Sequence, residues 1–198
     1  MILLSNLSKS FGTNRLFDEL SFSLDRGVYC LGGPSGCGKT TLGRILVGLE
    51  KADGGTVSGV VGHPVILFQE QRLLPSISAL RNVSSVSKDK DALSDAATLL
   101  KRLGFSEEDM DKHPNALSGG MQQRVAIARA LLFAKEYEGN LALLDEPFRG
   151  LDPDMKAVVA DMIREELADR AVLVITHDES DASLLCGKWL PFFGSPSK

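Results

Sequence analysis

Residues 28–46, VYCLGGPSGCGKTTLGRIL, place a glycine-rich loop between an apolar segment and a segment of helical periodicity. The apolar segment VYCLG favours a buried strand. After the loop, apolar residues recur at helical spacing: Leu42, Ile45, Leu46 and Leu49. The loop itself, GPSGCGKT at residues 33–40, matches the pattern G-x-x-x-x-G-K-S/T in full. A strand, such a loop and a helix in this order predict a phosphate-binding turn in an α/β fold.

Each residue type in this loop has a role in binding phosphate or Mg²⁺. Glycines let backbone N–H groups converge on phosphate oxygens, and the N-terminus of the following helix adds the positive end of its dipole. Lys39 is expected to reach the β- and γ-phosphates, and the Thr40 hydroxyl to ligate Mg²⁺. The predicted nucleotide contacts from this stretch are Gly33, Pro34, Ser35, Gly36, Cys37, Gly38, Lys39, Thr40 and Thr41.

Two further apolar segments end in polar side chains. LALLDE, residues 141–146, predicts a strand that delivers Asp145 to the edge of a parallel sheet, where Mg²⁺ would lie. Glu146 is then a candidate for orienting and deprotonating an attacking water; the alternative is a simple strand end. His177 closes the apolar run AVLVITH, and we expect it to contact the γ-phosphate rather than to serve a structural role.

Strand and helix patterns alternate at both ends of the chain, with a helical block between them. ILLSNL, LSFSL and VYCLGG predict strands within residues 1–31, and GGTVSGVVGHPVILF predicts strand, turn and strand. Residues 78–111 favour helix. The expected core face of that block consists of Leu93, Ala96, Ala97, Leu100 and Leu103. A helix around MKAVVADMIREEL, the strand AVLVITH and a weak strand KWLPFFG complete the pattern of an α/β domain with a helical insertion.

The composition of the chain favours some classes of protein and argues against others. The chain has 198 residues, of which 43% are hydrophobic and 24% charged, which suits one globular domain with a sizeable core. The formal net charge of −4 gives no basic footprint for nucleic acid. Cys30, Cys37 and Cys186 are widely spaced and predict free thiols in a reducing compartment. No run of 18 apolar residues is present, so any membrane role is expected to act through a partner.

Residues 117–124, LSGGMQQR, resemble the signature motif of the ATP-binding cassette (ABC) ATPases, specifically the nucleotide-binding subunit of a transporter. GPSGCGKT is similar to the family's Walker A motif, LALLDE to Walker B and VITHD to the switch-histidine motif. The resemblance spans residues 11–178. It implies a P-loop NTPase with a mainly parallel core sheet, a small antiparallel β-subdomain and a helical subdomain at about residues 76–130. It further implies that residues 1–198 form a single ABC ATPase domain with no C-terminal regulatory domain.

The resemblance also implies roles for residues outside the phosphate loop. Gln69 in ILFQEQRLLP matches the family's Q-loop, which contacts Mg²⁺ and water, and Asp152 in GLDPD occupies the acidic position of the D-loop. Phe11 matches the aromatic residue that stacks on adenine, although a core aromatic is the alternative. Family members form head-to-tail dimers with two-fold symmetry, in which the signature of one subunit caps the γ-phosphate held by the other. The residues implied to act in this way are Ser118, Gly119 and Gly120.

The function that the resemblance implies is ATP hydrolysis that powers transport, by a peripheral subunit on the cytoplasmic face of the cell membrane. ATP and Mg²⁺ are the implied cofactors. The implied partners are a second copy of the chain or a homologous ATPase subunit, transmembrane permease subunits and an extracytoplasmic solute-binding protein. Residues 69–83, QEQRLLPSISALRNV, resemble importers of nitrate, sulfonate or taurine. An exporter, a soluble ABC ATPase acting on DNA or ribosomes, and a nucleotide-dependent assembly module are the alternatives, and the solute is left open.

Several stretches depart from the family pattern. The segment GGTVSGVVGHPVILFQ is short, so we expect one hairpin of the β-subdomain to be trimmed. Residues 133–140, FAKEYEGN, predict a surface insertion between the signature helix and LALLDE. Arg149 precedes the D-loop at a position where small residues are common in the family, which leaves the details of the dimer contact open. Arg124 and Arg129, on the helix after the signature, are expected to form surface salt bridges.

Overall fold

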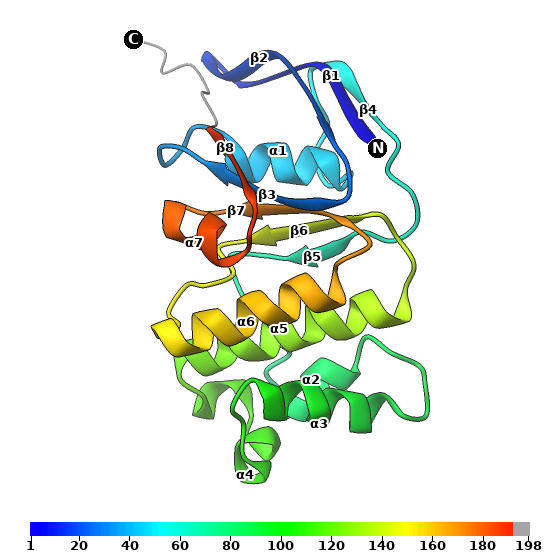
Figure 1. The fold of residues 1–198 in the computed structure, drawn as a ribbon, viewed down its shortest axis with the longest axis vertical. Coiled ribbons are helices and arrows are strands. Elements are labelled where there is room, and N and C mark those ends of the chain that lie inside the picture. The colour runs from blue at the N-terminus through cyan, green and yellow to red at the C-terminus, as the bar shows by residue number, and fades with distance from the viewer. Residues whose placement is uncertain (192–198) are drawn as a thin grey trace.

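The computed structural model describes residues 1–191, and the 192–194 part of the weak strand predicted in KWLPFFG lies outside them. The outer strands are β1 (Ile2–Phe11), β2 (Asn14–Leu24) and β4 (Gly54–Ser58). The central strands are β3 (Gly27–Gly32), β5 (Val65–Leu67), β6 (Leu141–Asp145), β7 (Ala171–Ile175) and β8 (Lys188–Pro191). The outer sheet is antiparallel in the order β2-β1-β4, and the central sheet is parallel in the order β5-β6-β7-β3-β8. The two sheets are separate layers along the long axis of the molecule (Figure 1).

The central sheet brings several chemically important segments to one edge. Its strands β6 and β7 are buried at every position, because a parallel sheet is covered by helices or strands on both faces. In the register of the sheet, Ile175 of β7 pairs with Asp145 of β6 and with Leu31 of β3. The glycine loop after β3, Asp145 at the end of β6 and His177 beyond β7 therefore lie at the carboxyl edge, where α/β sheets bind ligands.

Helix α1 (Lys39–Leu46) follows the glycine loop and lies between the two sheets (Figure 1). Its buried residues Leu42, Ile45 and Leu46 pack with apolar side chains of β1, β2 and the near face of the central sheet, as the periodicity predicts. The helical spacing predicts that the helix extends to Leu49, and this is wrong. The helix ends at Leu46, the chain turns at Gly48 with φ of +76°, and Leu49 is 56% exposed.

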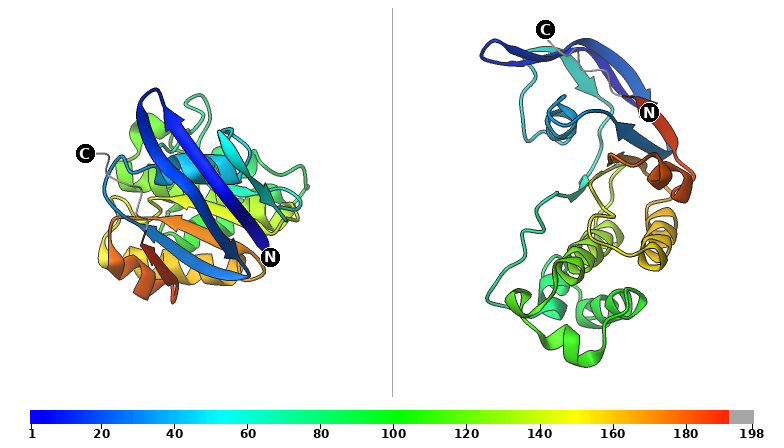
Figure 2. Two further views of the ribbon diagram at one scale, coloured as in Figure 1. Left: turned by 90° about the horizontal axis from the view of Figure 1, so that it is seen from above. Right: turned by 90° about the vertical axis from the view of Figure 1, so that its left-hand side faces the viewer.

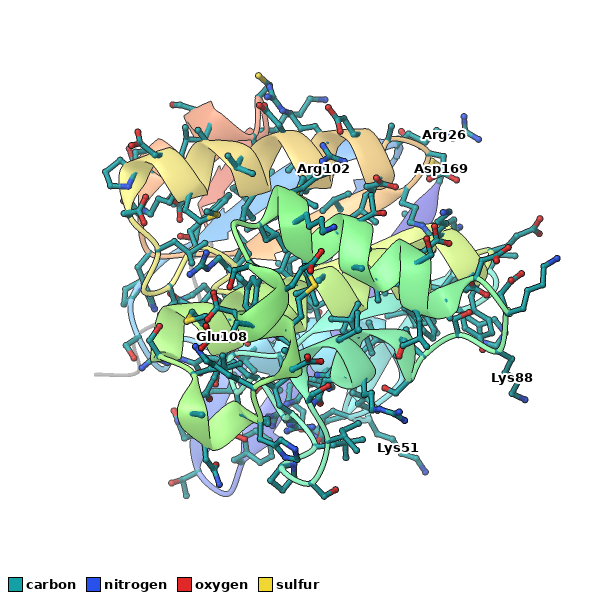
Figure 3. The ribbon with its side chains drawn as sticks, turned by 90° about the horizontal axis from the view of Figure 1, so that it is seen from below. Arg26, Lys51, Lys88, Arg102, Glu108 and Asp169 are labelled. Atoms are coloured by element: carbon teal, nitrogen blue, oxygen red, sulfur yellow. The ribbon has the colours of Figure 1, made fainter. Side chains whose placement is uncertain are left out.

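Helices α5 (Gly119–Glu136) and α6 (Pro153–Glu166) cover the other face of the central sheet (Figure 1). The remaining helical segments are α2 (Ala79–Ser84), α3 (Ala92–Arg102), α4 (Glu107–Asp111), the 3-10 turn η1 (Pro114–Ala116) and α7 (Glu179–Leu184). Helices α2 and α3 pack on α5, at the end of the molecule opposite the outer sheet (Figure 2). Arg102, at the end of α3, lies 2.5 Å from a carboxylate oxygen of Glu165 and thereby joins α3 to α6 (Figure 3).

The predicted core face of the helical block is correct in most positions. Ala96, Leu100 and Leu103 are buried, and Ala97 is partly buried against the same core. Leu93 is 51% exposed, so its assignment to the core is wrong. It lies in the first turn of α3, where the neighbouring Ala92 is the buried residue.

Two connections differ from their sequence expectations. The strands predicted in GGTVSGVVGHPVILF exist, but β4 joins the outer sheet and β5 joins the central one. Within the predicted insertion at 133–140, residues 133–136 belong to α5, where Ala134 is buried, and only residues 137–140 form the connection to β6; the insertion relative to the family stays a prediction. Arg170 donates hydrogen bonds to the main-chain carbonyls of Ala134 and Tyr137, at 2.9 and 2.6 Å, and so closes the end of the helix.

The helical subdomain boundaries near 76 and 130 stay predictions; α5 runs across the second of them. Within residues 1–191, we find no helix that combines the length and apolar character needed to span a bilayer.

Candidate nucleotide-binding and hydrolysis site

The glycine loop has the backbone conformation that its sequence predicts. Gly36 and Gly38 adopt φ of +79° and +105°, which favour glycine, and α1 begins directly after Gly38. A Cβ at Gly38 would also lie 3.1 Å from the Cβ of Leu16, because β2 packs against the loop. The Lys39 side chain is 5% exposed, and its Nζ donates to the carbonyl oxygens of Gly33 and Pro34, both at 2.8 Å. The ammonium is therefore held under the loop, within reach of a bound phosphate.

Thr40 and Asp145 meet although 105 residues separate them in the sequence. The Thr40 hydroxyl donates to Asp145 Oδ2 at 3.0 Å. Burial raises the pKa of Asp145, while this hydrogen bond and the charges of Arg44, Lys39 and His177 act in the opposite direction. A hydroxyl and a carboxylate side by side are hard oxygen ligands of the kind Mg²⁺ prefers beside nucleotide phosphates. The residues present at this point fit Mg²⁺.

Glu146 follows the end of β6 in an uncommon backbone conformation. Its φ is +55°, and its N–H donates to the carbonyl of Ile175 at 2.9 Å, which fixes it against β7. One carboxylate oxygen, Oε1, lies 2.9 Å from Nε2 of His177. The Glu146 carboxylate, directly after β6, and the His177 imidazole, just beyond β7, thus form a contact at the carboxyl edge of the sheet, next to Asp145. Such strained positions cluster at functional sites.

A cleft of about 280 Å³ collects these side chains. It is lined by Phe11, Leu16, Ser35, Gly36, Gly38, Lys39, Thr40, Thr41, Gln69, Asp145, Glu146, Ile175 and His177. Gly33, Pro34 and Cys37 are predicted contacts that do not line it: the first two accept the Lys39 hydrogen bonds, and Cys37 is half-buried. Thirteen residues from six segments of the chain converge here, which is the arrangement expected of a ligand site.

A larger cavity, of about 760 Å³, lies at the opposite edge of the central sheet. Arg26 and Asp169, labelled near its margin in Figure 3, and the capping residue Arg170 are among its lining residues. None of the predicted site residues contributes to it. Chemistry rather than size therefore identifies the smaller cleft as the candidate site.

The signature residues lie outside the cleft of their own chain. Ser118 is the N-cap of α5, and its hydroxyl accepts from the N–H of Met121 at 3.2 Å. Ser118 and Gly119 are exposed, and a Cβ at Gly120 would lie 2.8 Å from the carbonyl oxygen of Gly150. Asp152 caps α6 through a 2.9 Å hydrogen bond from the N–H of Met155. The N-terminus of α5 and the D-loop thus form one exposed surface, apart from the phosphate loop.

Two buried side-chain amides are not singled out by the motifs. Gln123, which is 1% exposed, donates to the carbonyls of Glu146 and Pro147 at 3.2 Å each and accepts from Gln71. Asn82 is fully buried and makes four hydrogen bonds to the main chain of residues 74–78. Both lie in segments that the sequence marks as important. A polar side chain at a core-facing helical position is the signal that would have singled them out.

Within residues 1–191, Arg124 and Arg129 do not form the salt bridges expected of them. Arg124 donates to the carbonyl of Leu103 at 2.6 Å, and Arg129 to the carbonyls of Gln71 and Arg72 at 2.7 and 3.0 Å. Burial lowers the pKa of Arg129. Arg124 thus holds the end of α3 against α5, and Arg129 holds the segment that follows Gln69 against the same helix.

The fold and the cleft together define a class. P-loop NTPases combine a parallel sheet, a glycine loop after one strand, a lysine and a threonine at the start of the next helix, and a carboxylate at the end of another strand of the same sheet, and all of these are present here. The separate β-sheet and the helical block around α2 and α3 are additions to that core (Figure 2).

Comparison with known proteins narrows the class to a family. The family model described as ABC transporter matches residues 17–149. The aliphatic sulfonates import ATP-binding protein SsuB 1 of Pseudomonas syringae pv. syringae is 37% identical, over 95% of this chain and 78% of that protein. SsuB 3 of Rhodococcus jostii is 39% identical, over 96% of this chain and 70% of that protein. A dimeric post-hydrolysis structure of the ATP-binding cassette MJ0796, bound to ADP and Pi, superposes with a TM-score of 0.81 at 26% identity, over 97% of this chain and 94% of the other.

The chain therefore belongs to the ABC transporter family. It is an ATP-hydrolysing, nucleotide-binding subunit with the α/β fold that the sequence predicts.

Proposed function

We propose that the chain powers the import of a small solute of the sulfonate class, as a peripheral subunit on the cytoplasmic face of the cell membrane. The sulfonate class is supported by the relatives at 37–39% identity, which carry the name of aliphatic sulfonate import proteins. The observation that carries the catalytic part of the proposal is the convergence of Lys39, Thr40, Asp145, Glu146 and His177 in one cleft.

The reaction is an in-line attack of water on the γ-phosphate of ATP, which breaks the bond between the γ-phosphorus and the bridging oxygen and releases ADP and phosphate. Lys39 and the backbone N–H groups of the glycine loop hold the β- and γ-phosphates, and Phe11 at the rim of the cleft stacks on the adenine. Thr40, Asp145 and Gln69 would hold Mg²⁺, which neutralises charge on the phosphate oxygens. Most of the acceleration then comes from positioning and electrostatics rather than covalent chemistry.

Glu146 acts as the general base in this proposal. Its carboxylate accepts a proton from the attacking water, while His177, whose Nε2 is 2.9 Å from Glu146 Oε1, orients that carboxylate and contacts the γ-phosphate. Gln69 lines the same cleft and orients the water. The 2.9 Å bond from the Glu146 N–H to Ile175 keeps the base at the sheet edge.

Two copies of the chain complete each site. Ser118, Gly119 and Gly120 lie on an exposed surface apart from their own phosphate loop. In a head-to-tail dimer with two-fold symmetry, this helix N-terminus of one copy caps the γ-phosphate bound by the other. Arg149 is exposed beside this surface and would face the partner copy.

The turn after Gln69 is the proposed contact with the transmembrane permease. Leu74 is half-exposed and Pro75 is exposed, and the buried Asn82 fastens their segment from beneath through hydrogen bonds with the N–H and carbonyl of Leu74. Because Gln69 lies in the cleft and Leu74 on the surface, movement of the permease would reach the Mg²⁺ site along one short segment. An extracytoplasmic solute-binding protein would deliver the solute to that permease.

Glu146→Gln tests the assignment of the general base. The amide cannot accept the water proton, so the hydrolysis rate should fall by about 10²–10⁴-fold while ATP binding is retained. The variant should also accumulate as an ATP-dependent dimer, measured by size-exclusion chromatography with light scattering. Glu138→Gln, an exposed glutamate far from the cleft, is the matched control. Wild-type turnover by Glu146→Gln would show that the base lies elsewhere.

Growth tests the solute class separately. A host strain that lacks this chain should fail to use aliphatic sulfonates as its sole sulfur source and should grow normally on sulfate. The wild-type chain should restore growth and Glu146→Gln should not. Unimpaired growth of the deletion strain on every sulfonate tested, with no loss of sulfonate uptake, contradicts the proposed solute class and leaves the ATPase assignment standing.

A further inference from the structure

Lys9 is a charged side chain in the core of the outer sheet. It lies in β1, two residues before Phe11, and is 7% exposed. Its Nζ is 2.8 Å from Glu50 Oε1, 2.7 Å from the carbonyl oxygen of Lys51 and 3.3 Å from Asp53 Oδ1. The hydrogen bond to Glu50 is the main reason that the pKa of Lys9 is raised, so the ammonium stays charged at neutral pH.

These contacts fasten the tip of β1 to the segment that follows α1. Asp53 accepts from the N–H of Ser10 at 2.7 Å through its second carboxylate oxygen, and the Asp53 N–H donates to the carbonyl of Ser8 at 2.9 Å. The residue directly before Phe11 is therefore tied to Asp53, which also binds the Lys9 ammonium. The main chain that carries Phe11 is therefore tied to Asp53 on one side of the strand and paired with β2 on the other, where Phe11 faces Asn14 in the register.

Lys9 also contacts the Phe11 ring itself. Its Nζ lies 5.0 Å from the ring centroid, within the range of a cation–π interaction. Phe11 is 53% exposed, yet it lines the same cleft as Lys39 and Thr40. A large exposed aromatic ring usually has rotamer freedom, which a ligand must remove on binding. Here the ammonium, itself anchored by two carboxylates, fixes the ring at the rim of the phosphate cleft.

We propose that Lys9 is a positioning residue for the nucleotide base: it holds the Phe11 ring in place so that a purine stacks on it. This inference rests on the proposed role of Phe11 in binding adenine. Lys9 does not line the phosphate cleft, so we expect its effect to be confined to ligands that carry a base. Fixing the ring before the ligand arrives lowers the entropy cost of stacking, and the cation keeps the ring from turning away.

The test compares Lys9→Met and Lys9→Arg with the wild-type chain, using Mg-ATP and Mg-tripolyphosphate as ligands in calorimetric titrations. Tripolyphosphate fills the phosphate loop but has no base. We expect Lys9→Met to weaken ATP binding and raise its KM about 3- to 30-fold, with kcat within about twofold, because cation–π contacts have energies of that order. Tripolyphosphate binding should be unchanged, and Lys9→Arg should restore most of the ATP affinity.

Phe11→Ala and the Lys9→Met/Phe11→Ala double variant complete a double-mutant cycle between the two residues. In the absence of the ring, Lys9→Met should have no further effect on ATP binding. If Lys9→Met does not fold, the Lys9→Gln/Glu50→Gln variant provides the same comparison, because an amide pair replaces the ion pair.

Three results would contradict the proposed role of Phe11 or the proposed role of Lys9, and they can be told apart. Unchanged ATP affinity in Phe11→Ala removes the proposed stacking role of Phe11, and the inference about Lys9 with it. Weakened ATP binding in Phe11→Ala together with wild-type ATP binding in Lys9→Met removes the inference alone. Equal weakening of ATP and tripolyphosphate in Lys9→Met means that Lys9 maintains the outer sheet as a whole and does not position the base.

Discussion

At the scale of single residues, the cleft depends on polar groups whose partners come from distant parts of the chain. Lys39 rests on carbonyls of its own loop, which phosphate oxygens can replace as hydrogen-bond acceptors. Thr40 meets Asp145 across the sheet edge, and Glu146 meets His177 in the same way. Motif spacing predicts all five residues, because these chemical types are tied to the ends of particular strands.

The three cysteines give a prediction about reactivity. Burial, with a smaller contribution from the charge of Asp181, raises the pKa of Cys30 to about 12, so almost none of it is thiolate at pH 8. Cys186 is exposed, and Cys37 is half-buried in the phosphate loop, with its Sγ 3.7 Å from Lys39 Nζ. We expect iodoacetamide at pH 8 to modify Cys186 and Cys37 but not Cys30, and Mg-ATP to protect Cys37. Peptide mass spectrometry measures each site, and labelling of Cys30 in the folded protein contradicts the burial argument.

At the scale of elements, α5 connects the two halves of the proposed machinery. Its N-terminus carries Ser118, and one turn later the buried Gln123 bonds to the main chain of Glu146 and Pro147 and to the Gln71 amide. The same helix therefore touches the proposed trans contact, the segment of the general base and the segment that follows Gln69. A rotation or shift of α5 would move all three together.

Gln123→Met tests how much the hydrogen bonds of Gln123 contribute to the stability of the fold. The substitution keeps the size of the side chain and leaves two buried carbonyls without their donor, so the free energy of unfolding should fall by about 1–3 kcal/mol. Chemical denaturation followed by circular dichroism measures the loss. Lys135→Met on the same helix is the control, since it removes only an exposed ion pair with Asp95, which contributes about 0–1 kcal/mol. Equal effects of the two substitutions would mean that the Gln123 bonds do not stabilise the fold.

At the scale of the whole molecule, the sequence predicts the arrangement of strands and helices better than it predicts where each helix begins and ends. The α/β fold follows from apolar strands alternating with helices, and the comparisons confirm it. Leu49 and Leu93 were misassigned because periodicity does not show where a helix ends or how its first turn faces. The end of α5 at Glu136 cannot be predicted from local sequence, because Arg170, which is distant in the sequence, closes it.

In the candidate site too, some residues can be predicted from the sequence and others cannot. Residues in motifs, such as Lys39 and Asp145, are predictable because phosphate and Mg²⁺ chemistry requires particular groups at particular strand ends. Lys9, Asn82 and Gln123 are not, because their partners are main-chain carbonyls or charges brought close only by the fold. Helix periodicity likewise cannot show that Arg124 and Arg129 bind carbonyls instead of carboxylates.

The central claim is that each hydrolytic site is shared by two chains, and mixed dimers test it most directly. Lys39→Ala and Ser118→Arg chains, each inactive alone, are co-expressed with different tags, and only dimers carrying both tags are purified. A head-to-tail dimer then has one site with both defects and one with neither, so the mixed dimer should hydrolyse ATP at about half the wild-type rate. A mixed dimer as inactive as either parent would contradict the account, because it would mean that Lys39 and Ser118 serve the same site within one chain.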